Sequence, residues 1–196
     1  DMFHRLLEHG ADLGSMRWAG YGRFNTSLDG IVERADASGG RLTGLYGMSE
    51  VQALFSVRDP SGSPAERTKA GGTIIADNAS ARVIDGELQL KGPSLFAGYL
   101  AEGGASVDDD LTADNYDDGW FRTGDLGIID AEGFVSITGR LKDIIIRKGE
   151  NISAKEIEDL LFAHPAIADA AVIGLPDEKS GERACAVVVC KQDSTI

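Results

Sequence analysis

The sequence is poor in positive charge. Its 19 Lys and Arg residues stand against 32 Asp and Glu residues, which gives a formal net charge of -13 over 196 residues. A protein that binds the phosphate backbone of a nucleic acid needs a basic face, so this balance argues against nucleic acid as a partner. It does not argue against a nucleotide site, because such sites use local hydrogen-bond donors rather than net charge.

Long apolar runs are also missing. No stretch approaches the ~20 apolar residues that a membrane span needs, and residues 1–5 do not resemble a signal peptide. Met2 follows Asp1, which is unlike a natural start, so we expect the chain to be a fragment or a processed product. His4 and His9 are five positions apart and would not share a helix face that could bind a metal.

Cysteine is limited to Cys185 and Cys190, which lie in the strand-like run 184–191. Residues five positions apart on a strand point to opposite faces, so we expect these two thiols not to pair with each other. Reduced thiols are typical of the cytoplasm, which is the location that we expect for this protein.

The sequence does contain many short apolar segments separated by turn residues. Hydrophobic residues make up 42% of the chain, which allows a packed core. Thr26 or Ser27 would cap one helix, and 108–110 should be a solvated acidic loop. The patterns predict helices at 2–9, 26–37 and 153–164, and strands at 15–21, 42–46, 72–76, 81–85, 87–91, 127–130, 134–138, 144–146, 168–174 and 184–191.

The pattern changes after Arg140. The run 144–146 is expected to be a buried strand, Ser153 and Glu156 form a capping box, and two more strands follow the helix. This βαββ order is typical of a small α/β unit with its helix on a sheet. We therefore expect a mixed α+β protein of two domains, 1–140 and 141–196, of which the first is rich in β structure.

Three segments carry residues suited to binding a nucleotide, and the first is 44–50. Here a strand ends at Gly47, whose turn would let a ligand approach the backbone. Tyr46 can stack on a purine, Ser49 can donate to a phosphate, and Glu50 can hold Mg²⁺ beside phosphate oxygens. The alternative is a strand end whose tyrosine packs in the core and whose glutamate is solvated.

The second segment is 119–127, in which Asp125 follows Gly124. A carboxylate behind a glycine turn can accept hydrogen bonds from both hydroxyls of a ribose, and such charge-assisted bonds are stronger than neutral ones. The alternative is an aspartate that only closes its own turn.

The third segment is 139–153. Arg140 presents a permanently charged, planar fork suited to ribose or phosphate oxygens. Lys142 stands between two regular regions, where a backbone rotation can be absorbed. Gly149 gives a tight turn with no side chain to block a ligand. The alternative is an ordinary basic turn before a capped helix.

In their order and spacing, Tyr46–Glu50, Thr123–Asp125 and Gly139–Ser153 together resemble the adenylate-forming (AMP-binding) enzymes, in particular the acyl- and aryl-CoA synthetases. The resemblance covers essentially the whole chain. It implies the later, β-rich part of the family's large N-terminal domain, followed by most of its small α/β C-terminal lid domain. The segment 147–153 resembles acyl-CoA ligases more than peptide-synthetase adenylation domains.

The resemblance implies roles for residues on the nucleotide side. Tyr46 would stack on the adenine, and Gly47 and Ser49 would line the ATP or AMP site beside it. Glu50 would serve catalysis by taking part in Mg²⁺ binding. Asp125 would bind the ribose hydroxyls.

It also implies roles for the later segment. Arg140 would assist at the same sugar during catalysis. Lys142 would be the hinge about which the lid rotates. Lys148 and Gly149 would line the path of the pantetheine arm of coenzyme A after that rotation.

The sequence departs from the family in two respects. The family shows a Gly-x-Ala-Pro-like turn beside the adenine, whereas the matching stretch 21–25 retains only Gly22. The family's phosphate loop and its adenylation lysine are not found in the 196 residues. We therefore expect this stretch alone to be inactive.

The implied function is that of an ATP-dependent carboxylic acid–CoA ligase. It would form an acyl-adenylate and then an acyl-CoA thioester from a small-molecule carboxylic acid, with ATP, Mg²⁺ and coenzyme A. One alternative is an adenylation domain that loads a carrier protein. Another is a non-catalytic module that binds a nucleotide or a protein partner. The sequence leaves open which acid is activated and the oligomeric state.

Overall fold

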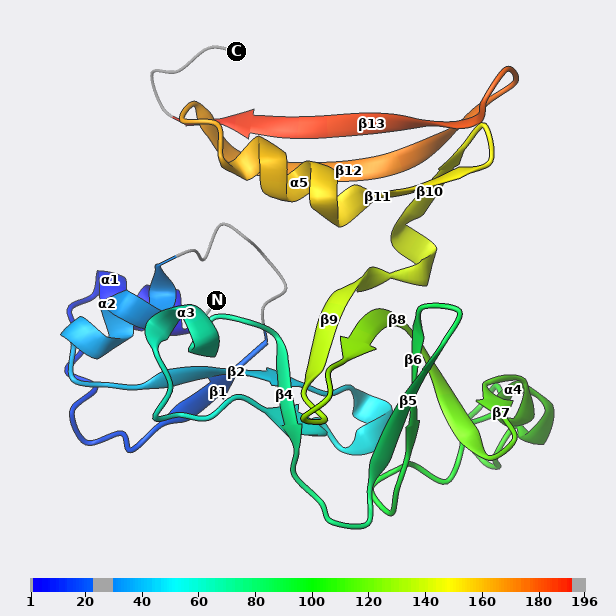
Figure 1. Ribbon diagram of the computed structural model, residues 1–196, viewed down its shortest axis with the longest axis horizontal. Helices are drawn as coiled ribbons and strands as arrows, with labels where there is room; N and C mark the ends of the chain where they lie inside the picture. The colour runs from blue at the N-terminus through cyan, green and yellow to red at the C-terminus, as the bar shows by residue number, and fades with distance from the viewer. Residues whose placement is uncertain (1, 23–29, 192–196) are drawn as a thin grey trace. The chain divides into compact units, whose positions relative to one another are not determined.

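A computed structural model describes residues 2–22 and 30–191 (Figure 1). The described residues form two compact units, which divide between Thr138 and Gly139. Each unit has its own sheet, with few and short helices, so the predicted mixed α+β class is confirmed. Among the described residues, no helix has the length and apolar character needed to cross a membrane.

The first unit is built on a nine-stranded sheet with the order β1-β2-β3-β4-β9-β8-β6-β5, in which β7 also pairs with β8. The first pair, β1 and β2, is parallel, with Ala19 opposite Leu42, whereas the other pairs described in this sheet are antiparallel. The strands are β1 Ala19–Tyr21, β2 Leu42–Tyr46, β3 Ser56–Val57, β4 Gly71–Ile74, β5 Ser80–Ile84, β6 Glu87–Lys91, β7 Tyr116–Asp117, β8 Trp120–Ile129 and β9 Val135–Arg140.

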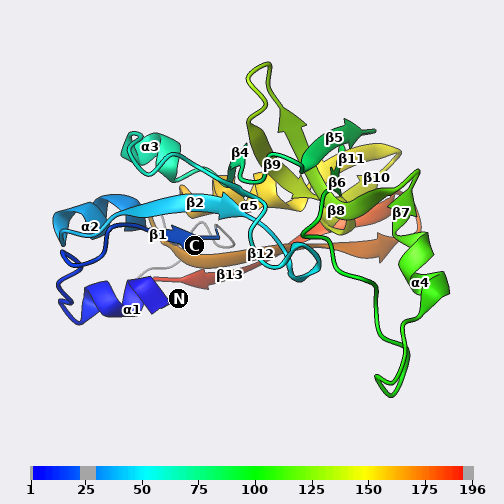
Figure 2. The same ribbon diagram turned by 90° about the horizontal axis from the view of Figure 1, so that it is seen from below.

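Short helices accompany this sheet. Figure 2 shows α4 beside β7, at the end of a long loop that follows β6. The helices are α1 Met2–Glu8, α2 Ile31–Ala37, the 3-10 turn η2 Ser49–Val51, α3 Pro64–Arg67 and α4 Asp109–Asp114.

One core cluster lies where β2, β6 and β9 bring apolar side chains together. Its buried members are Tyr46, Val51, Phe55, Leu88, Leu90 and Val135. The turn that places β6 was predicted from Asp85-Gly86, and it is confirmed. Both residues have positive φ, 50° and 84°, which is the backbone of the tight hairpin turns that match strand twist.

The structure differs from two of the predictions for the first unit. The strand predicted at 15–21 was too long, because only Ala19–Tyr21 pairs with β2. The acidic loop predicted at 108–110 was wrong in part, because Asp109 and Asp110 are exposed to solvent as expected but lie in the first turn of α4. The Asp108 side chain accepts a hydrogen bond from the Leu111 amide at 2.9 Å and caps α4, as expected where acidic residues meet a helix N-terminus. The predicted caps Thr26 and Ser27 lie outside the described residues.

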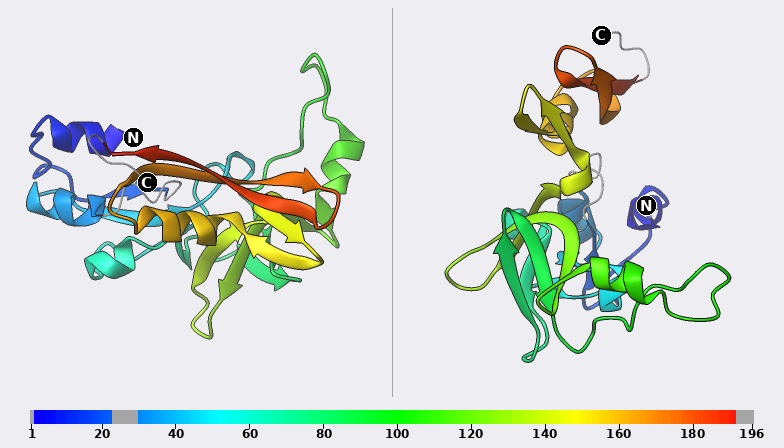
Figure 3. Two further views of the ribbon diagram at one scale, coloured as in Figure 1. Left: turned by 90° about the horizontal axis from the view of Figure 1, so that it is seen from above. Right: turned by 90° about the vertical axis from the view of Figure 1, so that its right-hand side faces the viewer.

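The second unit is a four-stranded sheet with the order β11-β10-β13-β12. The helix α5 packs against β12, as Figure 3 shows. Apart from the pairing of Gly181 with Arg147 of β10, the pairings of β13 within the described chain all go to β12. The elements are the 3-10 turn η3 Leu141–Asp143, β10 Ile144–Arg147, β11 Glu150–Ser153, α5 Ala154–Phe162, β12 Ile167–Asp177 and β13 Gly181–Cys190.

The predicted βαββ order of this unit was incomplete. The strand β11 was missed, because Lys148 and Gly149 form a tight turn, with φ of 53° and 82°, that folds the chain back along β10. The predicted burial of 144–146 was wrong in part. Successive side chains alternate between the two faces, so Ile145 is 2% exposed whereas Ile146 is 54% exposed.

The serine half of the predicted capping box and the two unpaired thiols are confirmed. The Ser153 hydroxyl accepts a hydrogen bond from the Glu156 amide at 3.3 Å, which caps α5. Cys185 and Cys190 are free thiols on β13. Much of that strand is open to solvent, including Val187 at 59% and Val189 at 56% exposed.

Candidate active site

The first two sequence motifs meet in the first unit. The hydroxyl of Tyr46, at the end of β2, donates a hydrogen bond to Oδ2 of Asp125, on β8, at 2.8 Å. The two residues are 79 positions apart in the chain, and both are buried. A buried carboxylate needs such donors, because its charge is costly without them. The contact therefore orients the Asp125 carboxylate on a tyrosine that belongs to the core.

The backbone before Asp125 is held by β6. Thr123 donates its hydroxyl to the carbonyl of Leu88 at 2.6 Å and accepts the Asp125 amide at 3.0 Å. The Gly124 amide donates to Oε1 of Glu87 at 3.0 Å. Gly124 has a φ of 69°, in the left-handed region where glycine carries no steric cost. Three hydrogen bonds and the backbone conformation of Gly124 thus fix this turn.

Glu87 supports this turn from an unusual position. It is only 6% exposed, and its second oxygen accepts a hydrogen bond from Nε of Arg122 at 3.1 Å. Glu87 and Leu88 fit the stretch that the family shows upstream of its ribose aspartate, but no contact was predicted for Glu87. The available signal was an acidic residue at the start of Glu87–Lys91, a strand whose next three residues are also buried.

Gly47 is required by the protein's own backbone. A Cβ added there would lie 2.1 Å from the carbonyl oxygen of Ala53. Ala53 lies this close to Gly47 because the Ala53 amide donates a hydrogen bond to the Met48 carbonyl at 2.8 Å. Both Gln52 and Ala53 also have positive φ, 58° and 74°. Strained residues of this kind persist where the surrounding structure holds them. The glycine thus shapes the turn that carries Ser49 and Glu50.

The Glu50 carboxylate is half-buried and has a tyrosine partner. The Tyr99 hydroxyl donates to Oε1 of Glu50 at 3.1 Å. Burial, followed by the negative charge of Glu50, raises the pKa of Tyr99 to about 12, so the phenol keeps its proton as a donor. This pair was not predicted, because no local pattern connects residues 49 positions apart.

The described residues suit a Mg²⁺ ion that is shared with phosphates. Among them, no group of three or more His, Cys, Asp or Glu side chains could hold a metal by itself. Mg²⁺ usually retains several waters and binds through one or two carboxylates together with substrate phosphates. Glu50 is a carboxylate of that kind, next to the exposed Ser49.

The third motif starts with the last two residues of β9, where the second unit begins, and continues through that unit. Arg140 and Lys142 are exposed, and Lys142 lies within the short turn η3. Lys148 and Gly149 form the exposed turn between β10 and β11, and the Lys148 amide donates to the Ser180 carbonyl at 2.8 Å. Within the described residues, and apart from its two chain neighbours, no atom lies within 4 Å of a Cβ placed on Gly149, so a ligand could pass beside its backbone.

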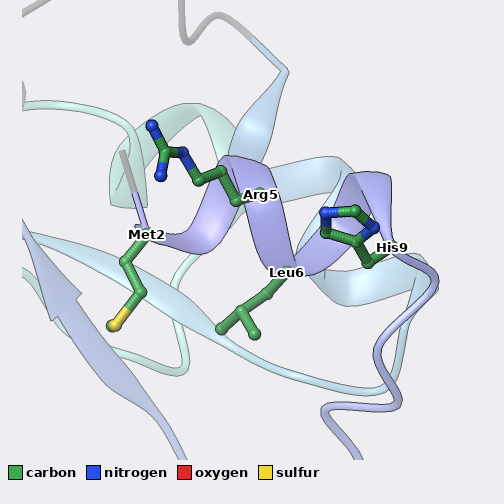
Figure 4. Close-up of a pocket in the computed structure, with 4 residues that line it drawn as sticks. All are labelled: Met2, Arg5, Leu6 and His9. Atoms are coloured by element: carbon green, nitrogen blue, oxygen red, sulfur yellow. The ribbon is translucent and has the colours of Figure 1, made fainter.

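A surface pocket lies elsewhere in the first unit. It is lined by Met2, Arg5, Leu6 and His9, on and just after α1 (Figure 4). None of these residues was predicted to act at the nucleotide site, and we assign no part of that site to the pocket.

Comparison with known proteins identifies the family. The model of the AMP-binding enzyme C-terminal domain matches residues 156–196. The chain is 37% identical over 201 aligned residues to the medium-chain fatty-acid–CoA ligase of Escherichia coli, covering 97% of this chain and 34% of the relative. The chain belongs to the adenylate-forming, AMP-binding superfamily. It corresponds to the C-terminal part of those enzymes.

Solved structures of adenylate-forming enzymes have the same fold. One is o-succinylbenzoate coenzyme A synthetase from Bacillus subtilis in complex with ATP and magnesium ion, with a TM-score of 0.78 and 28% identity over 99% of this chain and 41% of that one. Another is the amide bond synthetase McbA from Marinactinospora thermotolerans, with a TM-score of 0.79 and 30% identity over 99% of this chain and 42% of that one.

The match covers only part of these adenylate-forming enzymes. The chain spans about a third of the length of the first curated relatives that it matches, namely 34%, 32% and 38%.

Proposed function

We propose that the protein containing this chain is an ATP-dependent carboxylic acid–CoA ligase of the cytoplasm. The observation that carries the proposal is the buried contact of Tyr46 with Asp125, which joins the two nucleotide motifs. Support comes from relatives described as CoA ligases for fatty and other acids, and from a structural neighbour described as binding ATP and magnesium.

The first half-reaction would activate the acid. The substrate carboxylate attacks the α-phosphorus of ATP, and pyrophosphate leaves as acyl-AMP forms. Tyr46 would contact the adenine, with Gly47 and Ser49 lining the nucleotide site, and Asp125 would accept hydrogen bonds from the ribose hydroxyls. This step brings negative groups together, so fixed positive charge must offset the charge that develops.

Arg140 and Glu50 would each help to supply the positive charge that this step requires, Arg140 directly and Glu50 through a bound cation. Arg140 would bring its guanidinium to the sugar. Glu50 would hold Mg²⁺, which when bound neutralises charge on the phosphates.

The second half-reaction would use the second unit. The thiol of coenzyme A attacks the acyl carbon, and AMP leaves as the thioester forms. We propose that 141–196 is the lid domain, that 1–140 is the end of the large domain, and that the chain rotates at Lys142 between the two steps. Lys148 and Gly149 would then line the path of the pantetheine arm.

Residues 1–196 alone should have no ligase activity. The family's phosphate loop and adenylation lysine do not occur in this sequence, so activity is expected from the whole protein only. Acyl-AMP formation by these 196 residues in isolation would contradict this.

The proposed ligase and its alternatives differ in the molecule that accepts the acyl group. A structural neighbour described as an amide bond synthetase favours a second candidate, in which an amine takes the place of coenzyme A. Loading of a carrier protein is a third.

The decisive experiment is a pyrophosphate-release screen of the whole protein with short, fatty and aromatic acids, followed by product analysis with coenzyme A, a carrier protein or an amine. Acid-dependent pyrophosphate release with a thioester of coenzyme A as product supports the proposal. Release with a different product would assign one of the alternatives. The absence of release with every acid would point to a non-catalytic module.

A further inference from the structure

We propose that Tyr99 is the positioning residue for the Glu50 carboxylate and sets how tightly the site holds a divalent cation with ATP. The inference rests on the proposed function only in that Glu50 is taken as the metal-binding carboxylate. Tyr99 itself lies outside the three motifs and reaches the site through the fold.

The segment 96–99 holds Glu50 at two points. The Phe96 amide donates to the main-chain carbonyl of Glu50 at 2.8 Å, and the Tyr99 hydroxyl donates to Oε1 at 3.1 Å. In the described part of the chain, the side-chain hydrogen bond of Glu50 engages Oε1 alone. Fixing one oxygen in this way fixes the direction of the other, which is the oxygen that a cation would meet.

Tyr99 is itself fixed by the start of α4. Its amide donates to the Thr112 hydroxyl at 3.0 Å, and its carbonyl accepts the Asp108 amide at 2.8 Å. Its ring meets the ring of Phe96 edge to face, with 4.7 Å between the centroids. The hydroxyl therefore sits at the end of a rigid support.

Gly98 allows this approach. A Cβ at that position would lie 2.7 Å from both Thr112 Oγ1 and Val107 Cγ1, and its φ of 152° is one that other residues rarely adopt. The glycine thus lets the irregular segment 96–99 approach Thr112 of α4 at the point where Tyr99 turns toward Glu50.

Tyr99 would not contact the metal itself but would hydrogen-bond the carboxylate of Glu50 that binds it. Groups that hydrogen-bond a ligating carboxylate orient it, and their loss typically weakens metal binding by roughly 10- to 100-fold. A tyrosine that only fills space in an aromatic cluster would have no such effect when its hydroxyl is removed.

The test uses Tyr99→Phe in the whole protein, which retains the ring and removes the hydroxyl. Tyr116→Phe is the matched control, because Tyr116 is also half-buried and meets Phe121 edge to face at 5.5 Å. The readout is the affinity for Mn²⁺ in the presence of ATP, measured by electron paramagnetic resonance. We expect Tyr99→Phe to weaken Mn²⁺ binding roughly 10-fold and Tyr116→Phe to leave it near wild type.

A double-mutant cycle with Glu50→Gln shows whether Tyr99 acts through Glu50. If it does, Tyr99→Phe causes no further loss of Mn²⁺ affinity in the Glu50→Gln background. Equal losses in both backgrounds, or an unchanged affinity in Tyr99→Phe, would overturn the proposal. Thermal unfolding of each variant separates loss of the site from loss of the fold.

Failure of this proposal is distinguishable from failure of the ligase function. If the whole protein binds Mn²⁺ with ATP but releases pyrophosphate with no acid, the ligase proposal falls and Mn²⁺ affinity still decides the role of Tyr99. If the folded wild-type protein does not bind Mn²⁺ with ATP, the role of Tyr99 is overturned as well.

Discussion

The Tyr46 hydroxyl and Oδ2 of Asp125 are 2.8 Å apart, and the residues that carry them are 7% and 5% exposed. One residue is a core side chain at the end of β2, and the other is an acid on β8. Because the donor is part of the core, the orientation of this carboxylate depends on how the first unit packs.

Replacing Tyr46 with phenylalanine should lower the free energy of unfolding by about 1–3 kcal/mol. The ring would remain in its core cluster, but the buried Asp125 carboxylate would lose a donor. Urea unfolding of the whole protein, followed by tryptophan fluorescence, measures the change. Tyr116→Phe serves as the control, and a Tyr46→Phe variant as stable as that control would mean that the hydroxyl contributes little.

If the protein is the proposed ligase, Asp125→Ala should impair both half-reactions, because the ribose of the nucleotide would be bound by this carboxylate in each. Loss of two charge-assisted hydrogen bonds predicts a fall of roughly 100-fold or more in kcat/KM for ATP. Pyrophosphate release measures the first step, and thioester formation from supplied acyl-AMP measures the second. A normal second step in this variant would remove Asp125 from the ribose site.

Lys142→Pro should act on one half-reaction only. Proline fixes φ at about -65° and would restrict rotation within η3, so thioester formation should fall while acyl-AMP formation stays at the wild-type rate. The two assays used for Asp125→Ala apply here, and Lys142→Ala is the matched control for loss of the charge. Equal losses in both steps would contradict the hinge assignment.

Asp177 should make the second unit sensitive to acid. Its carboxylate accepts hydrogen bonds from the Ser180 hydroxyl at 2.7 Å and from the Ser180 and Lys179 amides at 2.8 and 3.0 Å. These bonds, the Ser180 hydroxyl first, hold the pKa of Asp177 below its ordinary value. A lowered pKa gives stability that is complete above the ordinary pKa and is lost as the pH falls through the lowered one.

The measurement is the unfolding midpoint as a function of pH. In wild type we expect the unfolding midpoint to fall below about pH 4, with a contribution from Asp177. In Asp177→Asn we expect a lower midpoint at neutral pH and a smaller fall of the midpoint in acid. Asp169→Asn, an exposed acid on the same strand, is the control. An Asp177→Asn variant whose acid dependence matches wild type would show that the turn does not depend on this charge.

Features that depend on neighbouring residues could be predicted from the sequence. Asp85-Gly86 predicts its hairpin because both positions need a backbone that few residues adopt, and Ser153 predicts its helix start because the cap and its amide are three residues apart. The acidic run at 108–110 carried a similar signal. The prediction of a loop there is wrong, because Asp108 has the spacing of a helix cap.

Features that depend on distant residues could not be predicted in this way. The contact between Tyr46 and Asp125 and the one between Tyr99 and Glu50 join residues 79 and 49 positions apart. No periodicity or turn signal encodes such a pairing. The resemblance to a family supplied Tyr46, Glu50 and Asp125 as candidates, but it gave neither their hydrogen bonds nor the support from Glu87.

The open side of β13 has a practical consequence for any preparation of these residues by themselves. Val187 to Val189 are exposed, and nearly all of the strand's described pairings lie on its β12 side. A long apolar strand with an open edge is a template on which further chains can add as strands. Light scattering at increasing concentration should therefore accompany any assay of the isolated stretch, since its loss of soluble material would otherwise be mistaken for a lack of binding.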